Sequence, residues 1–160
     1  GFIFLASFFL FYMIYEFLPV AGPQYYFKAV GTEAAETGVF PAVGYYFQTH
    51  TEMLMPEIKG IFSQLVLGAQ EVGERPTAAF PSSHVGMSTV TMLLAWQTKN
   101  KWLFWLMMPL YLLLCCATVY IQAHYLIDSI CGFFTALLFF WLTSLMYDRI
   151  HTRRMVNRKL

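Results

Sequence analysis

The most constraining feature of this chain is an apolar run from Trp102 to Tyr147, in which Asp128 is the only charged residue. As one helix the run would be about 69 Å long at 1.5 Å per residue, more than twice the roughly 30 Å hydrocarbon core of a bilayer. The run is therefore predicted to form two spans joined as a hairpin. We place the turn at residues 120–124, where Gln122 and His124 supply the polar side chains.

Two further apolar runs extend from Gly1 to Val20 and from about Ser82 to Trp96. Charged residues make up 12% of the 160-residue chain, roughly half the share found in an average soluble domain. The predicted fold class is an all-α integral membrane protein, a helical bundle of at least four transmembrane helices with residues 1–160 as a single membrane-embedded domain. The net charge of +1 argues against a nucleic-acid partner, and the expected partner is the lipid bilayer.

Basic residues predict the orientation of the spans. Lys99 and Lys101 lie between the second and third spans, and residues 149–160 form a basic tail after the fourth. Counting crossings puts both groups on one side of the membrane, which we expect to be cytoplasmic. Residues 21–81, in which glutamates outnumber basic residues, then form a non-cytoplasmic segment.

Part of this outer segment has the pattern of an amphipathic helix. One face at helical spacing carries Leu54, Ile58, Ile61, Phe62 and Leu65, and Pro56 suits the first turn. Periodicity alone leaves open whether the helix lies on the membrane surface or packs over the bundle. Residues 31–38 are expected to form a turn region.

The first cluster of polar residues precedes the second span and has the features of an anion site. Ser82 or Ser83 can cap a helix that begins there, and the free N–H groups of a helix N-terminus favour phosphate. Arg75 can add bidentate contacts to phosphate oxygens, and His84 falls in the first turn. The alternative is an ordinary capped helix with an interfacial histidine.

The second cluster is His124 with Asp128, which lie one turn apart on one helical face. A carboxylate beside an imidazole fixes its tautomer and raises its basicity. The pair could instead be a buried polar contact between helices. A metal site that includes His84 is a weaker alternative, because no His-x-x-x-His spacing supports it and Arg75 would repel a cation.

Together these clusters resemble the three motifs of the type 2 phosphatidic acid phosphatase superfamily, in the order Arg75-Pro76, Pro81-Ser82-Ser83-His84 and His124-x-x-x-Asp128. The resemblance implies that His124 is the nucleophile, forms a phosphohistidine and is supported by Asp128. It implies that His84 is the acid and that the phosphate is held by Arg75, Ser82 and Ser83. It implies neither a metal nor any other cofactor.

The resemblance also implies six spans, so two more are expected before Gly1. The chain has Gly68 and Thr118 where the family usually has a lysine and an arginine. Two further features, His124-Tyr125 and Gly22-Pro23, resemble the inositol phosphorylceramide synthase branch of the family.

The expected function is hydrolysis of a membrane lipid phosphomonoester or pyrophosphate through a phosphohistidine, at the non-cytoplasmic face. One alternative is transfer of a phospho-headgroup between lipids, as in the inositol phosphorylceramide synthase branch. A second alternative is a non-catalytic lipid-binding remnant.

The predicted orientation can be tested by labelling. A cysteine placed at Glu33 should react with a membrane-impermeant thiol reagent in intact cells, because this segment is expected outside. A cysteine at Lys101 should react only after lysis, and the parent chain controls for its three native cysteines. The opposite labelling pattern would overturn the orientation.

Overall fold

The computed structural model describes residues 1–54, 60–73, 75–98 and 101–157, and within them every regular element is helical. The α-helices are α1 (Phe2–Phe17), α2 (Pro23–Val30), α3 (Glu33–Thr37), α4 (Ile61–Gly73), α5 (Ser83–Gln97), α6 (Lys101–Tyr120) and α7 (Leu126–Asn157). A short 3-10 helix covers Tyr46–Gln48. The all-α prediction is confirmed.

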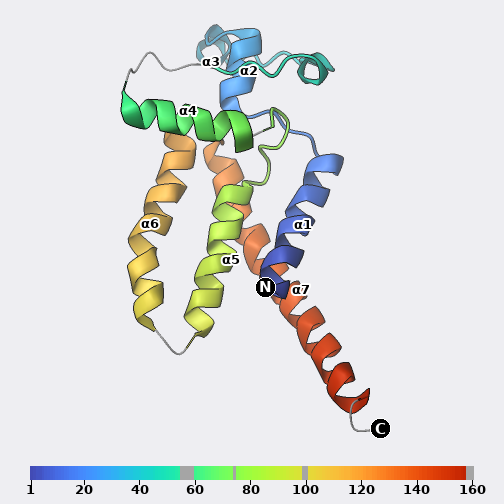
Figure 1. Ribbon diagram of the computed structural model, residues 1–160. Coiled ribbons are helices and arrows are strands. Elements are labelled where there is room, and N and C mark those ends of the chain that lie inside the picture. The colour runs from blue at the N-terminus through green and yellow to red at the C-terminus, as the bar shows by residue number, and fades with distance from the viewer. Residues whose placement is uncertain (55–59, 74, 99–100, 158–160) are drawn as a thin grey trace.

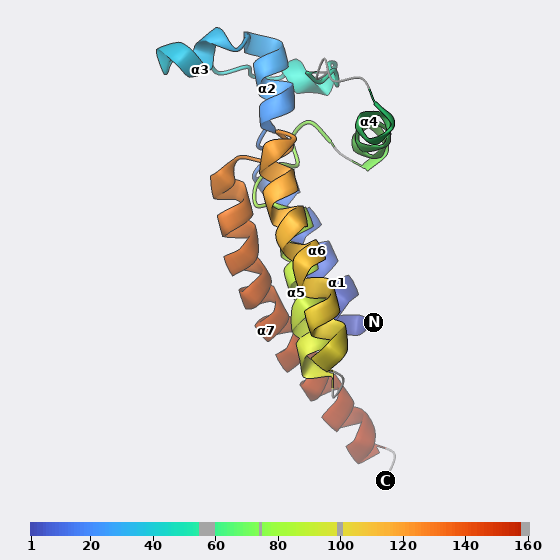
Figure 2. The same cartoon turned by 90° about the vertical axis from the view of Figure 1, so that its left-hand side faces the viewer.

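Four of these helices, α1, α5, α6 and α7, form a bundle in which α5 packs against the other three (Figure 1). Helices α6 and α7 are connected by residues 121–125, so the predicted hairpin and the position of its turn are confirmed. Helix α7 continues past the other helices at the far end of the bundle (Figures 1 and 2).

The core of the bundle lies where α1, α5 and α7 meet. Phe11 of α1 is fully buried against Val90 of α5 and Ala136 and Phe139 of α7. The two phenylalanine rings meet edge to face, with their centroids 5.1 Å apart. Gly86 of α5 leaves the space that the Phe11 ring occupies, because a Cβ there would collide with the ring.

The outward surface of the bundle is strongly apolar. Helices α6 and α7 are long and apolar enough to cross a membrane, whereas α1 is apolar but shorter. Large apolar side chains such as Leu110, Leu113 and Phe134 are more than 60% exposed, and such surface is stable against lipid rather than water. Length and apolarity thus identify two candidate membrane helices among the described residues.

The predicted outer segment gathers at one end of the bundle. Helices α2 and α3 extend beyond that end, and α4 lies across it at a steep angle to the bundle axis (Figures 1 and 2). Residues 31–38, predicted as a turn region, instead contain helix α3, with Gly31 and Gly38 at positive φ on its two sides. Glycine adopts this backbone conformation without the steric cost that other residues meet.

Helix α4 begins at Ile61, so the predicted amphipathic helix begins later than its apolar pattern indicated. Leu54 is not helical, and Pro56 and Ile58 lie outside the described residues. Ile61 and Leu65 are exposed, whereas the polar Gln70 is buried and its Nε2 donates to Oε1 of Gln24 at 2.9 Å. An apolar face that points away from the protein favours the first alternative, a helix at the membrane surface.

The contact between Gly86 and Phe11 gives a test of the bundle. Gly86→Ala should destabilise the fold by roughly 1–3 kcal/mol, because the new methyl group collides with a ring that has no free space around it. Gly68→Ala in α4 is the matched control, since a Cβ at Gly68 meets nothing within 4 Å. Thermal unfolding in detergent, followed by near-UV circular dichroism, should separate the two variants. Equal midpoints would contradict this packing.

Candidate active site

Two chain segments pair at the end of the bundle where α2 and α4 lie, and they hold the first predicted cluster. The amide of Val20 donates to the carbonyl of Thr77 at 3.1 Å, and the amide of Ala79 donates back to Val20 at 3.0 Å. The amide of Gly22 donates to the carbonyl of Pro76 at 3.1 Å. The loop that carries Arg75 is therefore tied to the end of α1 before the chain enters α5.

Ser82 caps the start of α5 and connects this helix to α7. Its buried hydroxyl accepts the amide of Val85 at 3.3 Å, which is the contact expected of a helix cap. Its own amide donates to the carbonyl of Asp128 at 3.0 Å. Gly132 permits the close approach of the helices, because a Cβ there would collide with the carbonyl of Ser82. Ser82 therefore has a structural position beneath the site.

The loop between α6 and α7 presents His124. Gln122 has a left-handed backbone with φ 60°, and its carbonyl accepts the amide of Gln24 at 3.1 Å. The amide of His124 donates to the carbonyl of Thr118 at 3.1 Å. Gly22 lies so close to the loop that a Cβ would be 2.8 Å from the carbonyl oxygen of Ala123, which explains the glycine of the Gly22-Pro23 pair.

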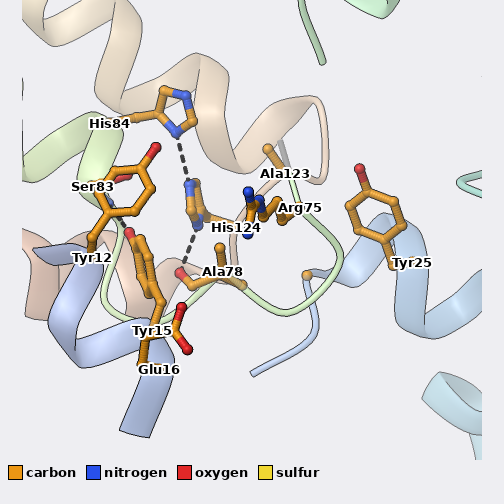
Figure 3. A pocket seen from close by; sticks show the side chains of 12 residues that line it. Tyr12, Tyr15, Glu16, Tyr25, Arg75, Ala78, Ser83, His84, Ala123 and His124 are labelled. Carbon is orange, nitrogen blue, oxygen red and sulfur yellow. Dashed lines mark hydrogen bonds between the residues drawn. The ribbon is translucent and has the colours of Figure 1, made fainter. Parts of the chain in front are cut away.

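The two predicted catalytic histidines are in direct contact (Figure 3). Nδ1 of His84 lies 3.1 Å from Nε2 of His124, and Nδ1 of His124 lies 2.8 Å from the carbonyl oxygen of Ala79. A carbonyl oxygen only accepts, so Nδ1 of His124 carries a hydrogen. In neutral His124 the lone pair is then on Nε2, the nitrogen that faces His84.

Burial keeps His124 neutral. The side chain is almost fully buried, and this burial together with the neighbouring His84 lowers its pKa from 6.5 to about 4. The hydrogen bond to Ala79 opposes this shift. Since the neutral imidazole predominates at pH 7, Nε2 is available as a nucleophile.

Asp128 makes a different contact from the one predicted. Its carboxylate accepts the amide of Tyr125 at 2.9 Å. Tyr125 immediately precedes α7 and Asp128 is the third residue of this helix, so the bond is the one that the third helical residue makes in a capping box. The partner of the His124 Nδ1 hydrogen is the carbonyl of Ala79. The contact that orients the His124 ring thus comes from Ala79, in the chain segment of the first cluster. The spacing between His124 and Asp128 in the sequence does not reveal this contact.

A cavity of about 260 Å³ opens beside the histidine pair. Four predicted site residues line it, namely Arg75, Ser83, His84 and His124, whereas Ser82 and Asp128 do not. Helix α1 adds three side chains that the motifs do not include, Tyr12, Tyr15 and Glu16 (Figure 3). Glu16 had a signal in the sequence as the lone charge of the first apolar run, and the two tyrosines had none.

The two residues at the positions where the family usually has cations do not line this cavity. Gly68 is an exposed residue of α4 and does not line the cavity. Thr118 is buried, and its hydroxyl donates to the carbonyl of Cys115 at 3.0 Å. Within the part of the chain that the structure describes, Arg75 is therefore the only Lys or Arg that lines this cavity. Among the described residues, no group of three or more His, Cys, Asp or Glu side chains could hold a metal ion.

Comparison with known families agrees with the motifs. The model of the PAP2 superfamily matches residues 2–142, which is most of the chain. The chain belongs to the PAP2 superfamily. No curated protein and no solved structure matches it.

The environment of His124 predicts a pH dependence. His124 should stay neutral as the pH falls to about 4, since burial and His84 disfavour its charged form. His84→Gln should raise the pKa of His124, although burial should still hold it below 6.5. The ¹³Cε1 resonance of His124, followed from pH 3.5 to 8 in labelled protein, measures this shift. His50→Gln, in the outer segment, is the control and should leave the titration unchanged; a midpoint near 6.5 in the unaltered protein would contradict the buried site.

Proposed function

We propose that this chain is a lipid phosphatase that hydrolyses a membrane lipid phosphomonoester or pyrophosphate through a phosphohistidine. The observation that carries the proposal is the contact between Nε2 of His124 and Nδ1 of His84 beside a cavity that Arg75 lines. A neutral nucleophile, a second imidazole and a guanidinium are the groups that phosphoryl transfer needs. Membership of the PAP2 superfamily supports the same reaction class.

In the first step the lone pair on Nε2 of His124 attacks phosphorus, and the bond between phosphorus and the lipid oxygen breaks. In this proposal the negative charge of the incoming phosphate holds His84 in its protonated form, and His84 gives its Nδ1 hydrogen to that oxygen. The phosphoryl group takes the place of the hydrogen bond between the two rings. The carbonyl of Ala79 holds the Nδ1 hydrogen of His124 and stabilises the positive charge that develops on the ring.

In the second step His84, now neutral, accepts a proton from water while the water oxygen attacks phosphorus. The bond between phosphorus and Nε2 breaks, its electron pair returns to His124, and phosphate leaves. Arg75 and the positive end of the α5 helix dipole are the phosphate-holding features of this proposal. Both histidines return to their starting protonation states.

We place this reaction at the non-cytoplasmic face of a four-span domain. Helices α1, α5, α6 and α7 would be the spans, with residues 21–81 outside and residues 149–160 as a cytoplasmic tail. Lys101 is the first residue of α6, and Arg149 belongs to the last third of α7. The start of α6 and the end of α7 lie at the bundle end opposite α2 and α4 (Figure 1). This charge distribution supports the orientation.

A second candidate function is transfer of the phosphoryl headgroup to an acceptor lipid. A larger cavity, of about 760 Å³, favours it. Neighbouring residues line the two cavities, since His124 faces the first and Tyr125 the second. An acceptor lipid in the second cavity would lie next to residues 121–125, the loop that carries His124. The contact between the two histidines favours either reaction over a non-catalytic remnant.

Turnover by purified protein in lipid nanodiscs tests the proposal. The unaltered chain should release phosphate from at least one member of a panel of lipid phosphates, and His124→Ala should abolish both release and acid-labile phosphate on the enzyme. His84→Ala should slow poor leaving groups by about 10²–10⁴-fold, because these need a proton from an acid. Aryl phosphates with leaving groups of low pKa should partly rescue His84→Ala but not His124→Ala.

His151→Ala is the control, because His151 lies near the far end of α7 and outside the cavity. Phosphate transfer that occurs only with a second lipid would favour the transferase. A phosphoenzyme that still forms in His124→Ala, or equal rescue of both variants, would refute the assigned roles. No turnover with lipid still bound would favour the remnant.

A further inference from the structure

Tyr15 is a cavity residue to which neither the motifs nor the reaction above gives a role. It belongs to the last turn of α1, and its hydroxyl reaches the start of α5 (Figure 3). The hydroxyl oxygen accepts the amide of Ser83 at 2.9 Å, and its hydrogen is donated to the carbonyl of Pro81 at 2.9 Å. Two short contacts thus fix a neutral donor beside the histidine pair.

The hydroxyl oxygen of Tyr15 accepts an amide at the start of α5, as an oxygen of a bound anion does at a helix N-terminus. The first amides of a helix have no acceptor within the helix. At the start of α5, the hydroxyl of Ser82 accepts one of these groups, the amide of Val85, and the amide of Ser82 itself donates to the carbonyl of Asp128. The amide of Ser83 donates to the oxygen of Tyr15. Tyr15 is therefore placed where the proposed phosphate site begins.

We propose that Tyr15 is a phosphate-binding residue of this site. Its oxygen keeps the amide of Ser83, and rotation about the bond between ring and oxygen turns its hydrogen from the carbonyl of Pro81 to a phosphate oxygen. This inference rests on the proposed function and deepens it, since it names a further ligand for the phosphate of the substrate.

The composition of the cavity explains why a neutral donor is useful there. Arg75 supplies a positive charge, and Glu16 lines the same cavity with a negative one. Gly68 and Thr118, at the positions of the usual family cations, do not line it. A phenol hydroxyl adds a donor to phosphate without adding another charge, and it is held in place by a stiff ring.

Tyr12 provides a matched control. It is on the same helix, lines the same cavity, and its ring centroid is 6.0 Å from that of Tyr15. Within the described part of the chain its hydroxyl makes no hydrogen bond. Tyr12→Phe therefore removes an equivalent atom from the cavity wall without touching the start of α5.

The experiment measures binding of inorganic phosphate to the full chain in nanodiscs, by ³¹P nuclear magnetic resonance, for the unaltered protein, Tyr15→Phe and Tyr12→Phe. Tyr15→Phe should weaken phosphate binding by about 10- to 100-fold, the usual effect of losing a hydrogen bond to a charged group. In turnover of an aryl phosphate, the same variant should raise KM. Tyr12→Phe should leave both quantities within about twofold of the parent.

A second measurement keeps the hydroxyl and so does not depend on how the phenylalanine variant folds. With 3-fluorotyrosine in place of Tyr15, phosphate should shift the ¹⁹F resonance, whereas the same label in place of Tyr12 should not respond. Equal behaviour at the two positions, in a protein that binds phosphate and turns over, would overturn the role of Tyr15 and leave the proposed function standing. An unaltered protein that neither binds phosphate nor turns over would overturn both.

Discussion

The arrangement of this site depends on the junction between α5 and α7. The amide of Ser82 donates to the carbonyl of Asp128, and the absence of a side chain at Gly132 lets the two helices approach closely. This contact satisfies a backbone donor that the start of α5 would otherwise leave buried without a partner. It also sets the distance between His84, in the first turn of α5, and His124, just before α7.

The chemistry of the site depends on a hydrogen-bond acceptor in the backbone. The carbonyl of Ala79 takes the Nδ1 hydrogen of His124, so the tautomer is fixed without a full negative charge beside the ring. Burial then keeps the ring neutral, with a pKa of about 4. Asp128 meanwhile closes the first turn of α7 through the amide of Tyr125, which positions the loop that carries His124, the proposed nucleophile. The geometry of this loop and the tautomer of His124 are thus set by different groups.

Much of the bundle was predictable because its signals are local. A run too long for one span requires a turn, and Gln122 and His124 mark it. The start of α5 follows from Ser82 as a cap. The start of α4 was less predictable, since the apolar residues at helical spacing include Leu54, which is not helical, and α4 begins at Ile61. Apolar periodicity shows which residues share a helical face, but it does not show where the helix begins or ends.

The sequence by itself determined the helical class, the hairpin and the pairing of two histidine motifs at one end of the bundle, because length, apolarity and order along the chain are sufficient for these. Only the tertiary structure decided which atoms meet. Tyr15 reaches Ser83, and the carbonyl of Ala79 reaches His124, across separations of 68 and 45 residues. Contacts of this kind depend on how α1 and the loops pack against α5, and no local pattern of residues encodes that packing.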